Sequence, residues 1–174
     1  MSKALVVVDM QNDFIDGSLG SAQAKKIVPN VVKLIEEWDG SILITKDTHS
    51  EDYLDTPEGK KLSVKHCIKG TEGWELNREV QEALNKKEVQ KFEYHKQTFG
   101  SVEMMDDIGV FGYDELLFVG LCTEICLVSN VLLAKAFFPN AKIEVKADCC
   151  AGVTPETHEA ALKTMQMCQV DILK

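Results

Sequence analysis

Short apolar runs alternate along the chain with longer amphipathic segments. Residues 4–8 (Ala-Leu-Val-Val-Val) are apolar throughout, which is typical of a strand buried on both faces of a sheet. Residues 22–38 instead repeat apolar side chains at helical spacing, as at Val28, Val31 and Ile35. The same alternation predicts further strands at residues 41–45, 89–94, 115–119, 142–146 and 170–173, and further helices at 75–85, 102–108, 126–137 and 155–168.

This order of elements predicts a single α/β domain over residues 1–174, with three α/β/α layers and a mostly parallel sheet of about six strands in a Rossmann-like topology. Residues 46–73 are polar and irregular, and loops of that length are commonly functional or disordered. In the final helix we expect Ala161, Met165 and Cys168 to face inward.

Composition narrows the partners and the compartment. The formal net charge of -9 argues against nucleic acid and anionic membranes as partners. No apolar run approaches the roughly 20 residues of a membrane span, and no signal peptide is recognisable. In a chain of this size with no recognisable signal peptide, we expect the six cysteines to be reduced thiols and the protein to be cytoplasmic. None of them forms a CxxC pair, which argues against a thiolate metal site.

Reactive side chains follow four consecutive predicted strands. Asp9 follows the first strand, Asp47 and His49 follow the second, Lys96 follows the third and Cys126 follows the fourth. In a parallel sheet these carboxyl ends share one edge, where ligands bind. The sequence therefore predicts an active site at that edge.

Cys126 is expected in the first turn of a helix, where unpaired N–H groups and the helix dipole favour the thiolate and Glu124 opposes it. Asp9 is a candidate proton carrier for this nucleophile, and Lys96 is a candidate cation that holds both groups. Each residue also has a plainer interpretation. Cys126 would be an inert buried cysteine, Asp9 a turn cap, and Lys96 a solvated surface lysine.

Three motifs resemble those of the isochorismatase-like cysteine hydrolases. Residues 9–14 (Asp-Met-Gln-Asn-Asp-Phe) resemble the family's D-x-Q-x-D-F opening, and residues 96–101 (Lys-Gln-Thr-Phe-Gly-Ser) resemble its lysine segment. Residues 120–127 resemble its nucleophile turn, G-x-A-T-D-x-C-V. The chain has Cys122, Glu124 and Leu127 where the family usually has alanine, aspartate and valine.

The resemblance implies an isochorismatase-like fold, with Cys126 as nucleophile, Asp9 as proton carrier and Lys96 as their electrostatic partner. It further implies a cis peptide before Cys122, so that the N–H groups of Cys122 and Cys126 form an oxyanion hole. Phe14 would be a wall of the substrate pocket or simply a core residue. Family members of the isochorismatase type lack the cysteine, so Cys126 favours amide hydrolysis.

The long loop holds candidate metal ligands. Asp47 and His49 form a D-x-H pair, and His66 follows later; carboxylate and imidazole suit zinc, iron or manganese. The resemblance extends here, because nicotinamidases of the family bind a divalent metal through D-x-H, a later histidine and one further ligand. Glu58 is the favoured fourth ligand. Asp52 and Asp55 are the alternatives for that position, and ordinary polar loop residues are the alternative to any metal site.

The resemblance thus implies a cysteine amidase that hydrolyses a small-molecule amide, nicotinamide, to nicotinate and ammonia. It also implies one bound divalent ion, for which zinc is favoured over iron or manganese, and no organic cofactor. We expect a homo-oligomer. A metal-independent amide or carbamoyl hydrolase, a different chemistry such as enol-ether hydrolysis, and a catalytically silent binding domain are the alternatives.

Overall fold

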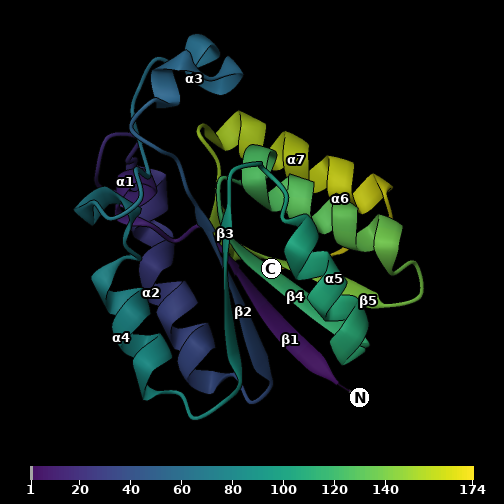
Figure 1. Cartoon of the computed structure of the whole chain (residues 1–174). Coiled ribbons are helices and arrows are strands. Elements are labelled where there is room, and N and C mark those ends of the chain that lie inside the picture. The colour runs from purple at the N-terminus through teal and green to yellow at the C-terminus, as the bar shows by residue number, and fades with distance from the viewer. Residues whose placement is uncertain (1) are drawn as a thin grey trace.

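Six parallel strands form one sheet in the order β3-β2-β1-β4-β5-β6, as the computed structural model, which describes residues 2–174, shows (Figure 1). The strands are β1 Lys3–Val8, β2 Ser41–Asp47, β3 Lys91–Lys96, β4 Glu115–Leu121, β5 Lys142–Ala151 and β6 Asp171–Leu173. The order reverses direction beside β1, so the carboxyl ends of β1 and β4 flank the crevice where ligands bind in such sheets.

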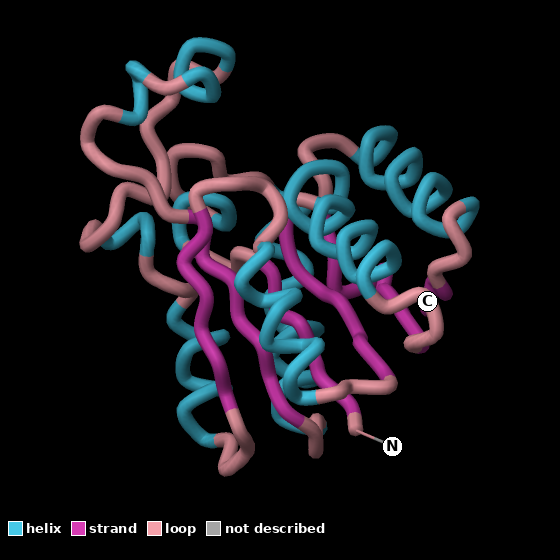
Figure 2. The backbone as a smooth tube through the Cα atoms, turned by 45° about the vertical axis from the view of Figure 1, so that its right-hand side comes forward, coloured by secondary structure: helices cyan, strands magenta, loops and turns pink. Residues whose placement is uncertain are grey.

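Helices cover both faces of the sheet (Figures 1 and 2). One face carries α1 Asn12–Ile15, α2 Ala22–Glu37 and α4 Arg78–Lys86, and the other carries α5 Val102–Phe111, α6 Val128–Phe137 and α7 Pro155–Met167. The alternation of β1 explains the two layers, because Leu5 and Val7 pack in the first core and Val6 and Val8 in the second. The predicted α/β/α architecture is confirmed.

Short helices interrupt the loop between β2 and α4. They are two 3-10 turns, Tyr53–Asp55 and Glu72–Trp74, and the helix α3 Pro57–Lys61, which stands apart from the sheet at the end of β2 (Figure 1). Thr56 caps α3 by accepting a hydrogen bond from Gly59 N–H, and Pro57 occupies its first position. This loop carries part of the candidate site described below.

Several boundaries differ from those predicted, for a shared reason. The strands β2, β3 and β4 each run two residues further, to Asp47, Lys96 and Leu121, because their last residues pair in the sheet even where they are polar. The prediction for Cys168 is wrong: α7 ends at Met167, so Cys168 lies beyond the buried face of the helix and is exposed.

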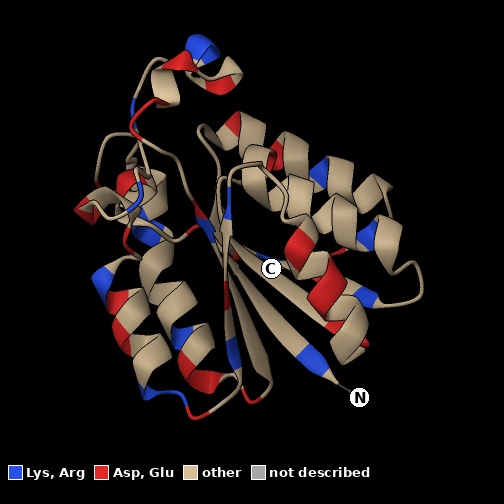
Figure 3. Cartoon of the chain, in the orientation of Figure 1, with Lys and Arg blue, Asp and Glu red and all other residues tan. Residues whose placement is uncertain are grey.

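Charged side chains lie mostly on helices, loops and strand ends, whereas the middles of β1 and β4 carry none (Figure 3). No helix within residues 2–174 has the length and apolar character needed to cross a membrane. All six cysteines are free thiols in this structure.

Candidate active site

Asp9 is turned into the interior at the end of β1. Its backbone adopts φ +49°, a left-handed conformation that aspartate tolerates better than most residues. Asp9 N–H donates to Thr45 O at 3.1 Å, and Thr45 Oγ1 donates to Asp9 Oδ1 at 2.7 Å. The carboxylate is completely buried, and these two contacts with β2 hold it in place.

Lys96, the last residue of β3, joins the other predicted catalytic residues. Its Nζ lies 2.6 Å from Asp9 Oδ2 and donates to Cys126 Sγ at 3.4 Å. A third partner is Asp47 Oδ1, at 3.7 Å. Lys96 is only 4% exposed, so it is not the solvated lysine of the plainer interpretation. A buried ammonium therefore links the thiol to two carboxylates.

The turn after β4 places Cys126. Gly120 has φ +120°, and a Cβ there would lie 2.1 Å from Val8 O, so only glycine lets β4 pair with β1 at this point. The chain then forms a short π-helix, Thr123–Leu127, before α6 begins at Val128. Cys126 is buried on the inner side of this turn.

One expectation for this turn is wrong. No peptide bond within residues 2–174 is cis, so the bond before Cys122 is trans, the form that is favoured by about 3–4 kcal/mol for a residue other than proline. Cys122 N–H still makes no hydrogen bond to the rest of residues 2–174, although Cys122 O accepts from Ile125 and Leu127 N–H. A donor thus remains free beside the thiol.

The electrostatics of the buried group differ from the prediction of a stabilised thiolate. Burial and the Asp9 carboxylate raise the pKa of the Cys126 thiol well above its ordinary value, and Lys96 offsets only part of this. Burial likewise raises the pKa of Asp9 against the opposing effect of Lys96. Cys126 Sγ therefore holds its proton more strongly than an ordinary thiol, and the Asp9 carboxylate, whose own pKa is raised, lies within hydrogen-bonding reach.

Removing the cation should make Cys126 less reactive. We expect iodoacetamide to alkylate Cys126 at least about tenfold more slowly in Lys96→Met, since each unit of pKa changes the thiolate fraction tenfold. Exposed Cys168 is an internal control whose rate should not change. Peptide mass spectrometry reads both sites, and Lys96→Arg, which keeps the charge, should retain more reactivity. Equal Cys126 rates in wild type and Lys96→Met would contradict the role of Lys96.

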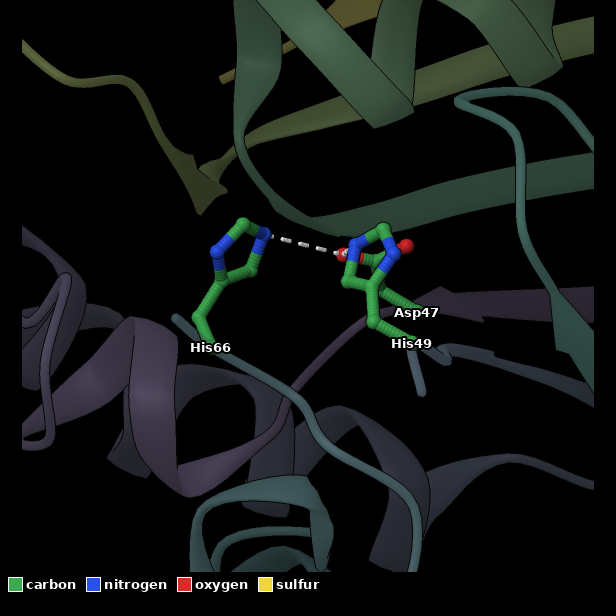
Figure 4. Close-up of side chains that lie close together, drawn as sticks. All are labelled: Asp47, His49 and His66. Atoms are coloured by element: carbon green, nitrogen blue, oxygen red, sulfur yellow. Dashed lines mark hydrogen bonds and ion pairs between the residues drawn. The ribbon is translucent and has the colours of Figure 1, made fainter. Parts of the chain in front are cut away.

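Asp47, His49 and His66 form a second cluster, shown in Figure 4. His49 Nε2 lies 3.0 Å and His66 Nε2 3.4 Å from Asp47 Oδ2, and one donor atom of each residue falls within 4.8 Å of the others. His66 Nδ1–H donates to Val64 O at 2.8 Å, which leaves its Nε2 as the free lone pair. These three donors fit a divalent cation of the zinc, iron or manganese type.

Glu58 reaches the same cluster from α3. Its Oε1 lies 3.8 Å from His49 Nε2 and 3.7 Å from His66 Nε2. Within residues 2–174, neither Asp52 nor Asp55 pairs with either histidine. The geometry therefore favours Glu58 over the two alternatives as the fourth donor.

One cavity, of about 650 Å³, connects the two clusters. Cys122, Cys126, Asp47, Glu58 and His66 all line it, whereas Asp9 and Lys96 lie behind its wall. The remaining lining residues are Phe14, Leu19, Pro57, Lys61, Leu62, Gln97, Thr98, Phe99, Ile125 and Val153.

Phe14 satisfies both interpretations of the sequence, since it lines the cavity 5.6 Å from the His66 ring and belongs to the core beneath. Sequence reasoning missed the walls made by Gln97, Phe99 and Val153. Gln97 directly follows Lys96 at the end of β3, and Phe99 comes two residues after Gln97, positions that could have indicated them. Val153 comes from the turn between β5 and α7, and no motif marks it.

The isochorismatase domain family matches residues 3–174. The chain belongs to the isochorismatase family. Within it, a nicotinamidase/pyrazinamidase of Mycobacterium tuberculosis is 26% identical over 98% of each chain. A probable inactive nicotinamidase of Arabidopsis thaliana is 30% identical over 94% of this isochorismatase-family chain and 87% of its own. The crystal structure of a nicotinamidase/pyrazinamidase, PncA, from Bacillus subtilis superposes with a TM-score of 0.86, at 26% identity and with all of both chains covered.

Proposed function

We propose that this protein is a cysteine amidase that hydrolyses nicotinamide to nicotinate and ammonia. The observation that supports it most is the contact of one buried lysine with both Asp9 and Cys126, directly behind a cavity that Cys126 lines together with metal-ligating side chains. The nicotinamidase relatives point to the same substrate. A small apolar cavity with a few converging polar groups suits an aromatic amide.

Attack begins with the Cys126 thiol. Asp9 takes the proton from Sγ as the sulfur bonds to the carboxamide carbon, whose oxygen becomes an oxyanion. The N–H groups of Cys122 and Cys126 donate to that oxygen. Asp9 then returns the proton to the amide nitrogen, the C–N bond breaks, and ammonia leaves a thioester on Cys126.

Water completes the reaction. Asp9 removes a proton from a water molecule whose oxygen attacks the thioester carbon, and the C–S bond breaks to release nicotinic acid and reform the thiol with the proton held by Asp9. Lys96 keeps Asp9 and Cys126 in place through both halves. Because Asp9 is completely buried, bulk water has little access to it, and the proton that it carries is not readily lost to solvent.

Asp47, His49, His66 and Glu58 are the side chains that would hold one divalent ion, which we propose to be zinc. When bound, the ion would act as a Lewis acid that binds the ring nitrogen of the substrate and so orients it. Glu58 sits on α3, so it also ties the outlying helix to the site. Cytoplasmic location and homo-oligomer assembly stay predictions.

Loss of a ligand should release the metal without unfolding the protein. We expect His49→Ala and His66→Ala each to lose bound metal and nicotinamidase activity, and Glu58→Ala to weaken binding more than Asp52→Ala or Asp55→Ala does. Elemental analysis of protein purified without chelator measures this, with thermal melting as the check on folding. Full metal content in His66→Ala would contradict the ligand set.

A panel of amides tests the proposed substrate. Ammonia release from nicotinamide, other small carboxamides and N-carbamoyl compounds should be measured before and after treatment with a chelator. We expect nicotinamide to be the preferred substrate, and its turnover to fall on chelation and return with zinc. Undiminished activity without metal would instead favour the metal-independent amide or carbamoyl hydrolase.

The Arabidopsis relative supports a second candidate, a catalytically silent protein. The convergence of Asp9, Lys96 and Cys126 argues against it, because a binding domain has no need of a buried thiol paired with an ammonium. No ammonia from any amide of the panel, together with an unreactive Cys126, would favour the silent protein.

A further inference from the structure

The loop after β1 contains a side chain that bonds to the backbone of a metal-ligand residue. Gln11 is completely buried. Its Oε1 accepts from Asp47 N–H at 2.7 Å, and its Nε2 donates to Asp47 O at 2.8 Å and to Trp74 O at 2.9 Å. One amide group therefore holds the N–H and the C=O of Asp47 at once.

Asp13, two residues later, holds the other side of the cluster. Its Oδ2 accepts from Cys67 N–H at 2.7 Å, and Cys67 directly follows His66. Cys67 has φ +47°, an uncommon conformation for a residue with a side chain, and needs support of this kind to persist. A Cβ on Gly73 would lie 2.2 Å from Asp13 Oδ2, so the neighbouring segment also packs closely on the carboxylate.

The hydrogen bonds of Gln11 to Asp47 and of Asp13 to Cys67 act on two backbone segments that are themselves hydrogen-bonded to each other. His49 N–H donates to Cys67 O at 2.9 Å, so the residue held by Asp13 in turn holds the third ligand. A metal site needs its donor groups held within about 0.5 Å of the binding geometry. Cys67 has an uncommon backbone conformation, and the Asp47 backbone is held by two hydrogen bonds from Gln11. A small shift of the loop after β1 would therefore displace all three metal-ligating side chains.

We propose that Gln11 and Asp13 are positioning residues that set the metal affinity of the Asp47, His49 and His66 cluster. The inference rests on the proposed metal site and extends it to two residues outside the ligand cluster. It also gives the loop after β1 two tasks, because the same loop begins with Asp9.

Zinc titration against a competing chelator tests the proposal on the full-length protein. The variants are Gln11→Leu, Asp13→Ala and Asp13→Asn, after removal of bound metal. We expect the dissociation constant for zinc to rise about 10- to 100-fold in Gln11→Leu and Asp13→Ala, the usual effect of losing a partner that orients a ligand. Asp13→Asn keeps an oxygen that can accept from Cys67 N–H, so its affinity should stay within a few-fold of wild type.

A matched control separates positioning from general loss of stability. Ser21→Ala removes the side chain that accepts from Ala24 N–H at the start of α2, remote from the cluster. It should lower the melting temperature of the metal-free protein and leave zinc affinity unchanged. Alkylation of Cys126 should stay at the wild-type rate in Asp13→Ala, which shows that the catalytic cluster is intact.

Wild-type zinc affinity in folded Gln11→Leu and Asp13→Ala would overturn the proposal. If Gln11→Leu does not fold, the contrast between Asp13→Ala and Asp13→Asn decides, and equal affinities overturn it. A wild-type protein that binds no zinc would overturn both this inference and the metal site. Ammonia release by that same metal-free protein would still support the cysteine amidase, so the two failures are distinguishable.

Discussion

Cys126→Ala should stop amide hydrolysis, with ammonia release at least about 1,000-fold slower than in wild type. Without Sγ no covalent thioester can form, and Asp9 has no thiol proton to accept. Cys126 is also the thiol that Lys96 contacts. The measurement is initial rate at saturating nicotinamide on zinc-loaded protein, with zinc content and melting temperature confirmed equal.

Cys122→Ala is the matched control for this substitution. Both cysteines line the cavity. Lys96 donates to Cys126 Sγ, whereas burial and the Glu124 carboxylate raise the pKa of the Cys122 thiol to about 12. Only its backbone N–H has a proposed role, which alanine keeps. We expect most of the activity to remain. A wild-type rate in Cys126→Ala, or complete loss in Cys122→Ala, would reverse the assignment of the nucleophile.

Asp9→Asn should slow turnover about 100- to 10,000-fold, the range for loss of general acid–base catalysis. Asparagine has nearly the same shape and can still accept from Thr45 Oγ1, but it cannot take the thiol proton or return one to the leaving nitrogen. It also leaves Lys96 without its nearest carboxylate. Rates with nicotinamide, measured beside zinc content and thermal stability, give the size of the effect.

Thr45→Val tests whether Asp9 acts by chemistry or by packing. This change removes the 2.7 Å hydrogen bond to Asp9 Oδ1 and keeps the carboxylate. It should cost far less activity than Asp9→Asn. If the two variants lose the same small factor, Asp9 is a structural residue and the proton carrier must be sought elsewhere.

The fold could be predicted because strands buried on both faces appear in a sequence as apolar runs. The sequence therefore indicates the strands at residues 4–8 and 115–119 directly. The ends of β2 and β3 cannot be predicted in this way, since Asp47 and Lys96 are polar residues whose burial depends on the site they build. The short helix α3 and the exposure of Cys168 depend on tertiary contacts and on where a helix ends, which periodicity alone does not determine.

The candidate site was predictable to the same extent. Parallel strands bring their carboxyl ends together, so the convergence of Asp9, Lys96 and Cys126 followed from their positions after successive strands. The raised pKa of Cys126 did not, because burial and the Asp9 carboxylate outweigh Lys96 only once the chain is packed. The contacts of Gln11 likewise join segments 36 residues apart, which no local pattern reveals.

Incubating zinc-loaded wild-type protein with nicotinamide and measuring both products tests whether this protein is a cysteine amidase. We expect nicotinate and ammonia in equal amounts, formed catalytically and dependent on Cys126. A folded, zinc-loaded protein with an alkylatable Cys126 that releases neither product from nicotinamide would contradict it.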